Sequence, residues 1–198
     1  MEVEPIHINC HSGLDDFSFQ DAVSFFKSVE GLETKVGLKC SLSHETHRGR
    51  ILFSPWRTLE LIKEIPSLKF TLDLSHWVVV SERLIEIDRI LPVLERTLHI
   101  HARLATPQAS QVSNPNTMDT IIKQYFEKVW LTVWKSQARS NVQFLLDPEY
   151  GPLCDSYMPN NTWFTDGKVT KVGGELDLDE LIISEGKRLF ELHKMLIA

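Results

Sequence analysis

The stretch His-Ile-His-Ala-Arg at residues 99–103 follows a leucine and alternates imidazole with apolar side chains. Because successive side chains of a strand point to opposite faces, a strand here carries both imidazoles on one face. A single histidine on a strand is more often a satisfied core residue, whereas two on one face, followed by an arginine, favour a functional site. Three further stretches place polar side chains behind strand-like runs in the same way: Ser-His-Glu-Thr-His-Arg-Gly-Arg (43–50), Leu-Asp-Leu-Ser-His-Trp (72–77) and Asp-Pro-Glu-Tyr-Gly-Pro (147–152).

Each of these four stretches supplies one hard or borderline metal ligand, and helix-like sequence separates them. One such ligand per repeating βα unit is how a parallel barrel builds a divalent-metal site at one rim. The candidate ligands are Glu45, Asp73, His101 and Glu149. Each has a plainer interpretation when taken alone: a solvated salt bridge for Glu45, a helix cap for Asp73 and a surface turn for Glu149.

The chain alternates between the two patterns typical of strands and helices. Strands are predicted at 6–10, 36–42, 68–72, 98–101 and 142–146. Helices are predicted at 18–35, 55–65, 79–96, 118–139 and 177–196, with long polar loops at 104–117 and 151–176. Such alternation predicts a parallel sheet with right-handed crossovers, in a single domain over 1–198.

Composition describes an ordinary globular protein of 198 residues, 42% of them hydrophobic. The net charge of −6 argues against a nucleic-acid partner, since such proteins usually carry a basic surface. The three cysteines show no metal-binding or redox spacing, which suits a reducing compartment. We see no secretory signal and no apolar run of membrane-spanning length, and therefore expect a cytoplasmic protein that does not bind a membrane.

The four stretches resemble the xylose-isomerase-like TIM-barrel family, the superfamily of sugar and sugar-phosphate isomerases and epimerases that also contains endonuclease IV. The similarity is carried by residues 44–50, 73–77, 99–103 and 148–152, and by an earlier strand end at 9–13. It implies that Glu45, Asp73, His101 and Glu149 are the four metal ligands. The predicted substrate-binding residues around them are His11, His47, His76 and Arg103.

A complete (β/α)₈ barrel needs about 250 residues, and this chain supplies five strands that match the fourth to the eighth of the family. The predicted fold is therefore an α/β, incomplete (β/α)₈ TIM barrel of five parallel strands with flanking helices, lacking the first three βα units. Five strands leave two unpaired edges. We expect apolar side chains to line the open interior, and name Ile8, Leu38, Phe70, Ile100 and Phe144.

Exposed edges and apolar surface predict a homodimer or a partner chain that completes the barrel. The alternative is that the N-terminal segment and the loop at 151–176 fold over the gap.

The resemblance implies a divalent-metal-dependent sugar or sugar-phosphate isomerase or epimerase that acts on a small sugar-like substrate. Glu45 and Glu149 are the predicted catalytic pair, exchanging a proton through an enediolate. The ligand set favours Mn²⁺, Mg²⁺ or Co²⁺, with Zn²⁺ as an alternative. Two other functions stay open: a non-catalytic metal-binding or interaction protein, and a metal phosphoesterase like endonuclease IV. The acidic charge and the single-metal ligand set disfavour the phosphoesterase.

Overall fold

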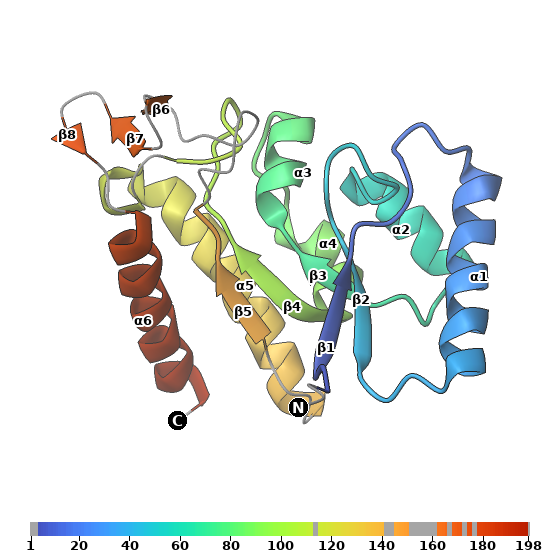
Figure 1. The fold of residues 1–198 in the computed structure, drawn as a ribbon. Helices are drawn as coiled ribbons and strands as arrows, with labels where there is room; N and C mark the ends of the chain where they lie inside the picture. Colours follow the sequence, from blue (N-terminus) through green and yellow to red (C-terminus); the bar gives the residue numbers. More distant parts are fainter. Residues whose placement is uncertain are drawn as a thin grey trace.

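The computed structural model describes residues 4–112, 115–140, 145–150 and 178–197, with the backbone of 162–165, 168–171 and 174–175. Five parallel strands form one sheet in the order β1-β2-β3-β4-β5 (Figure 1). Their bounds are β1 His7–Cys10, β2 Ser41–Glu45, β3 Phe70–Leu72, β4 Thr97–Ala102 and β5 Leu145–Pro148. The sheet is strongly curled: β1 and β4 are not neighbours, yet the ring centroids of His7 and His99 are 5.4 Å apart. The prediction of an incomplete α/β barrel is confirmed.

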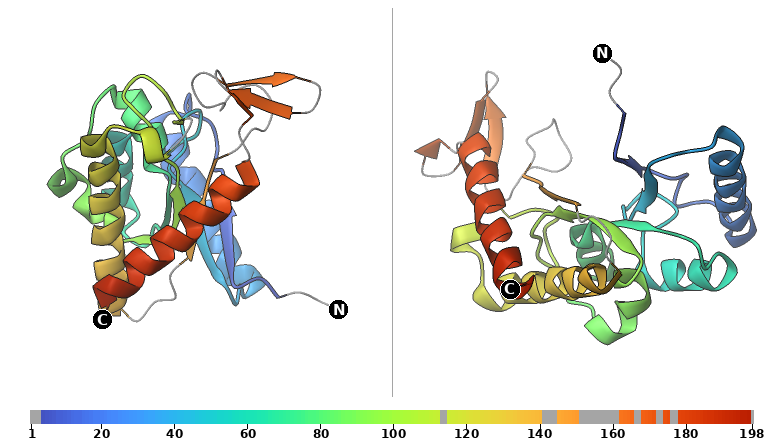
Figure 2. Two further views of the ribbon diagram at one scale, coloured as in Figure 1. Left: turned by 90° about the vertical axis from the view of Figure 1, so that its left-hand side faces the viewer. Right: turned by 90° about the horizontal axis from the view of Figure 1, so that it is seen from below.

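Helices connect the strands and cover the convex face of the sheet, whose edge strands in the described part of the chain are β1 and β5 (Figure 2). Their bounds are α1 Phe19–Val36, α2 Pro55–Glu64, α3 Leu74–Ser81, α4 Ile87–Leu94, α5 Thr120–Ser140 and α6 Leu178–Ile197. A short 3₁₀ turn, η1, covers Pro115–Thr117. Because every crossover brings the chain back in the same direction, all five strands end at the same rim of the half-barrel.

The helix ends carry local signals that fix where each helix starts. Ser18 caps α1 by accepting from the backbone N–H of Asp21, and Gly37 ends α1 in the left-handed conformation at φ 61°. Ser54 caps α2, where Pro55 occupies the first turn without losing a hydrogen bond. Asp73 caps α3 directly after β3, so a site residue is anchored by the helix that follows it.

The hydrophobic core lies between the sheet and the helices on the convex side. Phe70 and Ile100 are fully buried in it, together with Trp77, whose indole Nε1 donates to the backbone carbonyl of Leu52 at 2.8 Å. The prediction that Phe70 and Ile100 line an open apolar interior is therefore wrong. The reason is the two-residue alternation: with His99 and His101 on the concave face, Ile100 must face the helices.

For the other predicted interior residues, the assignment to an apolar lining stays a prediction. Ile8 is half-buried in β1, and Leu38 is half-buried in the connection between α1 and β2. Phe144 lies outside the described residues.

Several predicted boundaries differ from the structure. The second strand starts at Ser41 rather than near 36, because α1 continues to Val36. The helix predicted at 79–96 is two helices, the first of which begins at Leu74. The expected loop at 151–176 contains a small antiparallel sheet of β6 Thr162–Thr165, β7 Lys168–Lys171 and β8 Gly174–Glu175.

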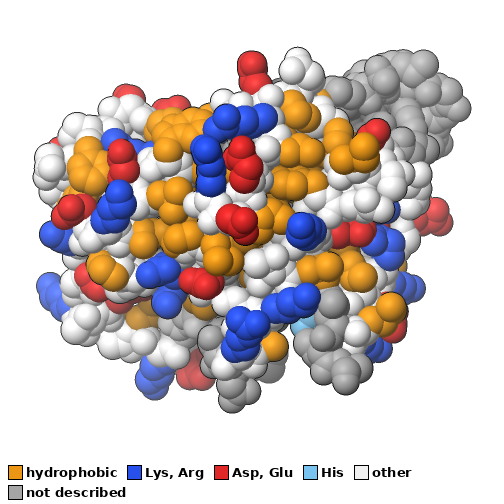
Figure 3. Space-filling model, turned by 180° about the vertical axis from the view of Figure 1, so that it is seen from behind, with side chains coloured by type: hydrophobic (Ala, Val, Ile, Leu, Met, Phe, Trp, Pro, Cys, Tyr) orange, Lys and Arg blue, Asp and Glu red, His pale blue; other side chains and the backbone are white. Residues whose placement is uncertain are grey.

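The back of the molecule, on the helical side, mixes Lys, Arg, Asp and Glu side chains with apolar patches (Figure 3). Neither sign of charge dominates this face. Among the described helices, none combines the length and the apolar character that crossing a bilayer requires.

Candidate metal centre

The four predicted ligands lie at the rim where the strands end. Glu45 is the last residue of β2, and Asp73 directly follows β3. His101 lies near the end of β4, and Glu149 directly follows β5. Side chains that follow successive parallel strands meet at this rim, which is where barrel enzymes bind their substrates.

Glu45 is 2% exposed and accepts several hydrogen bonds. Its Oε2 accepts from Nδ2 of Asn9 at 2.7 Å and lies 3.0 Å from Nε2 of His11, while Oε1 lies 3.6 Å from Nδ1 of His101. Burial alone raises the pKa of the Glu45 carboxyl, but the bonds from His101, His11 and Asn9 outweigh it and hold the pKa far below its usual value. Glu45 is therefore ionised at neutral pH.

Asp73 is fully buried and uses its two oxygens for different partners. Oδ1 accepts from the backbone N–H and the hydroxyl of Ser75, at 2.9 and 2.5 Å. Oδ2 accepts from Nη2 of Arg103 at 2.5 Å. Burial raises the pKa of Asp73, and the charge of Arg103, assisted by that of His76, more than reverses this. The carboxylate of Asp73 is thus held charged although the residue itself is not exposed to solvent.

His101 joins the two glutamates. Its Nδ1 lies 3.1 Å from Oε2 of Glu149 and 3.6 Å from Oε1 of Glu45. Burial lowers the pKa of His101, but hydrogen bonds to Glu149 and Glu45 raise it to about 10. The ring is consequently protonated at neutral pH when no metal is bound, and a cation that binds there displaces this proton.

Arg103 pairs with two of the carboxylates, those of Asp73 and Glu149, and is 2% exposed. Nη1 lies 3.0 Å from Oε1 of Glu149, and Nε donates to the hydroxyl of Ser75 at 2.9 Å. With Nη2 on Asp73, the guanidinium fixes two predicted ligands at once. Its predicted role in substrate binding stays a prediction.

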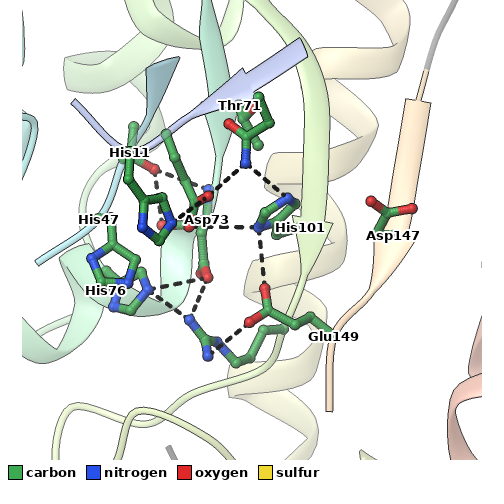
Figure 4. Close-up of polar contacts among 12 residues, drawn as sticks. His11, His47, Thr71, Asp73, His76, His101, Asp147 and Glu149 are labelled. Atoms are coloured by element: carbon green, nitrogen blue, oxygen red, sulfur yellow. Dashed lines mark hydrogen bonds and ion pairs between the residues drawn. The ribbon is translucent and has the colours of Figure 1, made fainter. Parts of the chain in front are cut away.

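Three imidazoles line one side of the site (Figure 4). The ring centroids of His11 and His47 are 4.4 Å apart, and those of His47 and His76 are 3.9 Å apart. The row runs from the exposed His11 to the fully buried His76, whose Nε2 lies 3.4 Å from Oδ2 of Asp73. Burial lowers the pKa of His76 to about 3, so that ring is neutral and can accept or donate a hydrogen bond. Substrate binding by these three histidines stays a prediction.

The donor set fits a divalent cation. One ligand atom each from Glu45, Asp73 and His101 lies within 4.8 Å of the other two. Ligands at the usual ~2.0–2.3 Å from one ion are about 3–4 Å apart, so the shell closes with small side-chain shifts. Glu149 is outside this group of three. It contacts the group at His101 and is also paired with Arg103.

Two supporting residues had not been singled out from the sequence. Asn9 binds Glu45, and its place at the end of β1 is the signal that points to it. Ser75 holds Asp73 and Arg103 together, and its position in the first turn of α3 places its backbone N–H under the capping carboxylate.

No protein-family model and no curated protein matches this chain. Among solved structures, the chain is similar to the crystal structure of the probable 3-DHS dehydratase AsbF, involved in petrobactin synthesis, from Bacillus anthracis. The identity is 20% and the TM-score 0.50, over 75% of this chain and 58% of that chain. The match thus spans little more than half of that protein, and at this identity it shows the fold alone.

Proposed function

We propose that this chain contains the active-site residues of a divalent-metal-dependent sugar or sugar-phosphate isomerase or epimerase of the xylose-isomerase-like superfamily. The observation that carries the proposal is the pairing of two carboxylates, Glu45 and Glu149, on the same nitrogen of His101. Two carboxylates around one metal position can remove a proton from a carbon next to a carbonyl and return it, as base and acid.

Glu45 is the better candidate for the base. It is buried and held in the charged form by its hydrogen bonds to His101, His11 and Asn9. Its low pKa makes it a weak base towards water, so it depends on a substrate whose C–H bond has been acidified. A Mn²⁺, Mg²⁺ or Co²⁺ ion held by Glu45, Asp73, His101 and Glu149 supplies that acidification when bound, as a Lewis acid.

Glu149 is suited to return the proton. Its side chain is 35% exposed, against 3% for Glu45, so it can move while the buried carboxylate stays fixed. Arg103 positions Glu149 through the contact at 3.0 Å. Burial lowers the pKa values of His47 and His76, so these two imidazoles offer uncharged donors to the hydroxyl or phosphate groups of a sugar.

The test is a panel of aldoses, ketoses and their phosphates, incubated with Mn²⁺ in D₂O and analysed for isomers and for deuterium at the exchanging carbon. We expect Glu45→Gln to lose both signals while keeping its circular-dichroism spectrum. The matched control is Glu86→Gln, which alters an exposed glutamate at the start of α4 and should keep wild-type turnover. Chelation with EDTA should abolish turnover, and Mn²⁺ should restore it.

Loss of water from a hydroxylated carbonyl compound begins with the same proton removal. The similar fold of the probable 3-DHS dehydratase makes dehydration the second reaction to assay. Metal binding without turnover on either panel would instead support the non-catalytic alternative.

A further inference from the structure

A second polar layer lies beneath the metal centre on the concave face. This layer contains the five residues that lie two positions before Asn9, Glu45, Asp73, His101 and Glu149. The proposed reaction does not use them. The members of the layer are His7, Ser43, Thr71, His99 and Asp147. Because strand side chains alternate, this set shares the face of the metal centre, one layer towards the strand starts. Closed barrels of this type usually fill this layer with branched aliphatic side chains.

Hydrogen bonds connect the layer into two groups. Nε2 of His7 lies 2.9 Å from Oγ of Ser43, which is 2.6 Å from Oγ1 of Thr71. Nε2 of His99 lies 2.9 Å from Oδ2 of Asp147. The rings of His7 and His99 meet edge to face, at 5.4 Å between centroids.

Burial limits what this layer can bind. Ser43 and Thr71 are fully buried and His99 is 6% exposed, so within this layer Asp147 is the residue most open to solvent. The buried atoms that have no hydrogen-bond partner among the described residues include Nδ1 of His99 in this layer and Oδ1 of Asn9 in the layer above it. The side-chain nitrogen of Asn9 donates to Glu45 in the upper centre, whereas its side-chain oxygen has no donor among the described residues. Buried acceptors without partners are costly, and a cation is one way to satisfy them.

We propose that His99, His101 and Asp147 form a second cation site, of the zinc class. One ligand atom from each lies within 4.8 Å of the other two, and the rings of His99 and His101 are 4.9 Å apart at 83°. Two imidazoles and one carboxylate are a common protein ligand set for Zn²⁺, with water completing the tetrahedron. This donor set is softer than that of the upper centre, where carboxylates dominate.

The open edge of the sheet gives the ion a way in. Asp147 lies on β5, the outermost strand, and its side chain is 69% exposed. Figure 4 shows Asp147 set apart from the upper network, on the far side of His101. An ion can therefore meet this carboxylate first and then the buried imidazoles.

The two sites share the ring of His101. Its Nδ1 faces Glu45 and Glu149, and its Nε2 lies 3.5 Å from the side-chain amide of Asn9. When both sites are filled, the ring bridges them as an imidazolate, and its remaining proton passes to the solvent. Filling the lower site then adjusts the position of a ligand of the upper one.

The test is equilibrium dialysis of the purified protein against Zn²⁺, followed by metal quantification per chain. We expect two ions for the wild type, one for Asp147→Asn, and one for Asp73→Asn, which affects only the upper centre. His99→Gln should match Asp147→Asn, and in both the lower-site affinity should fall by at least about tenfold. Because Asp147 is exposed, Asp147→Asn should fold normally and still tests the lower site if His99→Gln misfolds. The matched control is His193→Gln on α6, whose ring packs on Trp134 and which should still bind two ions.

The outcomes separate the two sites. An ion that persists in Asp73→Asn and is lost in Asp147→Asn supports the lower site even if no turnover is ever found. Two ions in Asp147→Asn and His99→Gln would overturn the second site and leave the proposed function untouched. The second site would also be overturned if the wild type bound a single ion and that ion were lost only in Asp73→Asn.

Discussion

Replacing Arg103 with methionine removes a positive charge that pairs with two predicted ligand carboxylates, while an unbranched side chain of similar reach remains. Arg103 binds Asp73 at 2.5 Å and Glu149 at 3.0 Å, and Asp73 is fully buried. Breaking a buried ion pair from one side costs about 3–5 kcal/mol, because the other charge stays buried without compensation. We expect the metal-free variant to lose free energy of unfolding in that range, measured by urea denaturation.

A divalent cation should reverse much of this loss. A ligand present at about a thousand times its Kd adds about 4 kcal/mol to the free energy of unfolding. Wild type gains this too, but the variant should gain more, because Arg103 no longer competes with the cation for Oδ2 of Asp73. The deficit of Arg103→Met relative to wild type should therefore shrink when Mn²⁺ is added.

Arg188→Met is the matched control for this experiment. Arg188 pairs with Glu127 at 2.6 Å and with Glu185 at 2.5 Å, joining α6 to α5 away from the site. Its side chain is 32% exposed, so we expect a smaller loss of about 1–3 kcal/mol, unchanged by Mn²⁺. A deficit for Arg103→Met that is equal with and without metal would refute the reasoning, as would a metal-free variant as stable as wild type.

Three further predictions concern the scaffold that positions the site. Gly13 has φ +56°, and an added Cβ would lie 2.5 Å from Cδ1 of Ile51, so Gly13→Ala should cost about 1–3 kcal/mol. Gly31→Ala in α1 meets nothing within 4 Å and should instead stabilise by about 0.5–1 kcal/mol, and thermal denaturation of both variants decides the matter. Ser54→Ala removes the cap of α2, which accepts from Arg57 N–H at 3.4 Å, and should lower stability by about 1 kcal/mol in the same assay. An unchanged melting temperature for Ser54→Ala would show that this long bond contributes nothing.

The candidate site could be located from sequence because strand periodicity and strand order leave little freedom. His99 and His101 must share a face, and side chains that follow parallel strands must meet at one rim. For Asp73 the helix-cap interpretation is confirmed, because Oδ1 accepts from the backbone N–H of Ser75 at the start of α3. The metal-ligand interpretation stays a prediction, and Oδ2 binds Arg103 in the metal-free protein. The sequence alone could not show that Arg103 would bind the carboxylates, because a contact across 30 residues depends on how the sheet curls.

The interior of the half-barrel was the larger failure of prediction. Apolar strand residues such as Phe70 and Ile100 were assigned to the concave face, although the alternation with His99 and His101 already excluded this for Ile100. The sequence analysis also misses the small sheet at Thr162–Thr165 and Lys168–Lys171. The signal was present, because β-branched and aromatic residues flank Asp166-Gly167, a pair typical of two-residue hairpin turns. The surrounding stretch 151–176 is rich in Asn, Gly and Asp, and this composition favoured a loop over the whole segment.

The edge of the sheet bears on the predicted homodimer or completing partner chain. Part of that prediction rested on exposed apolar side chains in the interior, and the structure instead puts histidine and carboxylate side chains there. Among the described residues no strand pairs with the outer edges of β1 and β5, and such edges offer strand pairing. Sedimentation at micromolar concentration tests this: a folded monomer would exclude the dimer.

The central claim is that Glu45, Asp73, His101 and Glu149 hold one divalent cation at the strand ends. The most direct measurement is a crystal structure of the protein soaked in Mn²⁺, with anomalous diffraction to locate the ion. The account predicts an anomalous peak about 2.0–2.3 Å from a donor atom of each of the four side chains. A map with Asp73 still bound to Arg103 and no peak between Asp73 and Glu45, at saturating Mn²⁺, would contradict it.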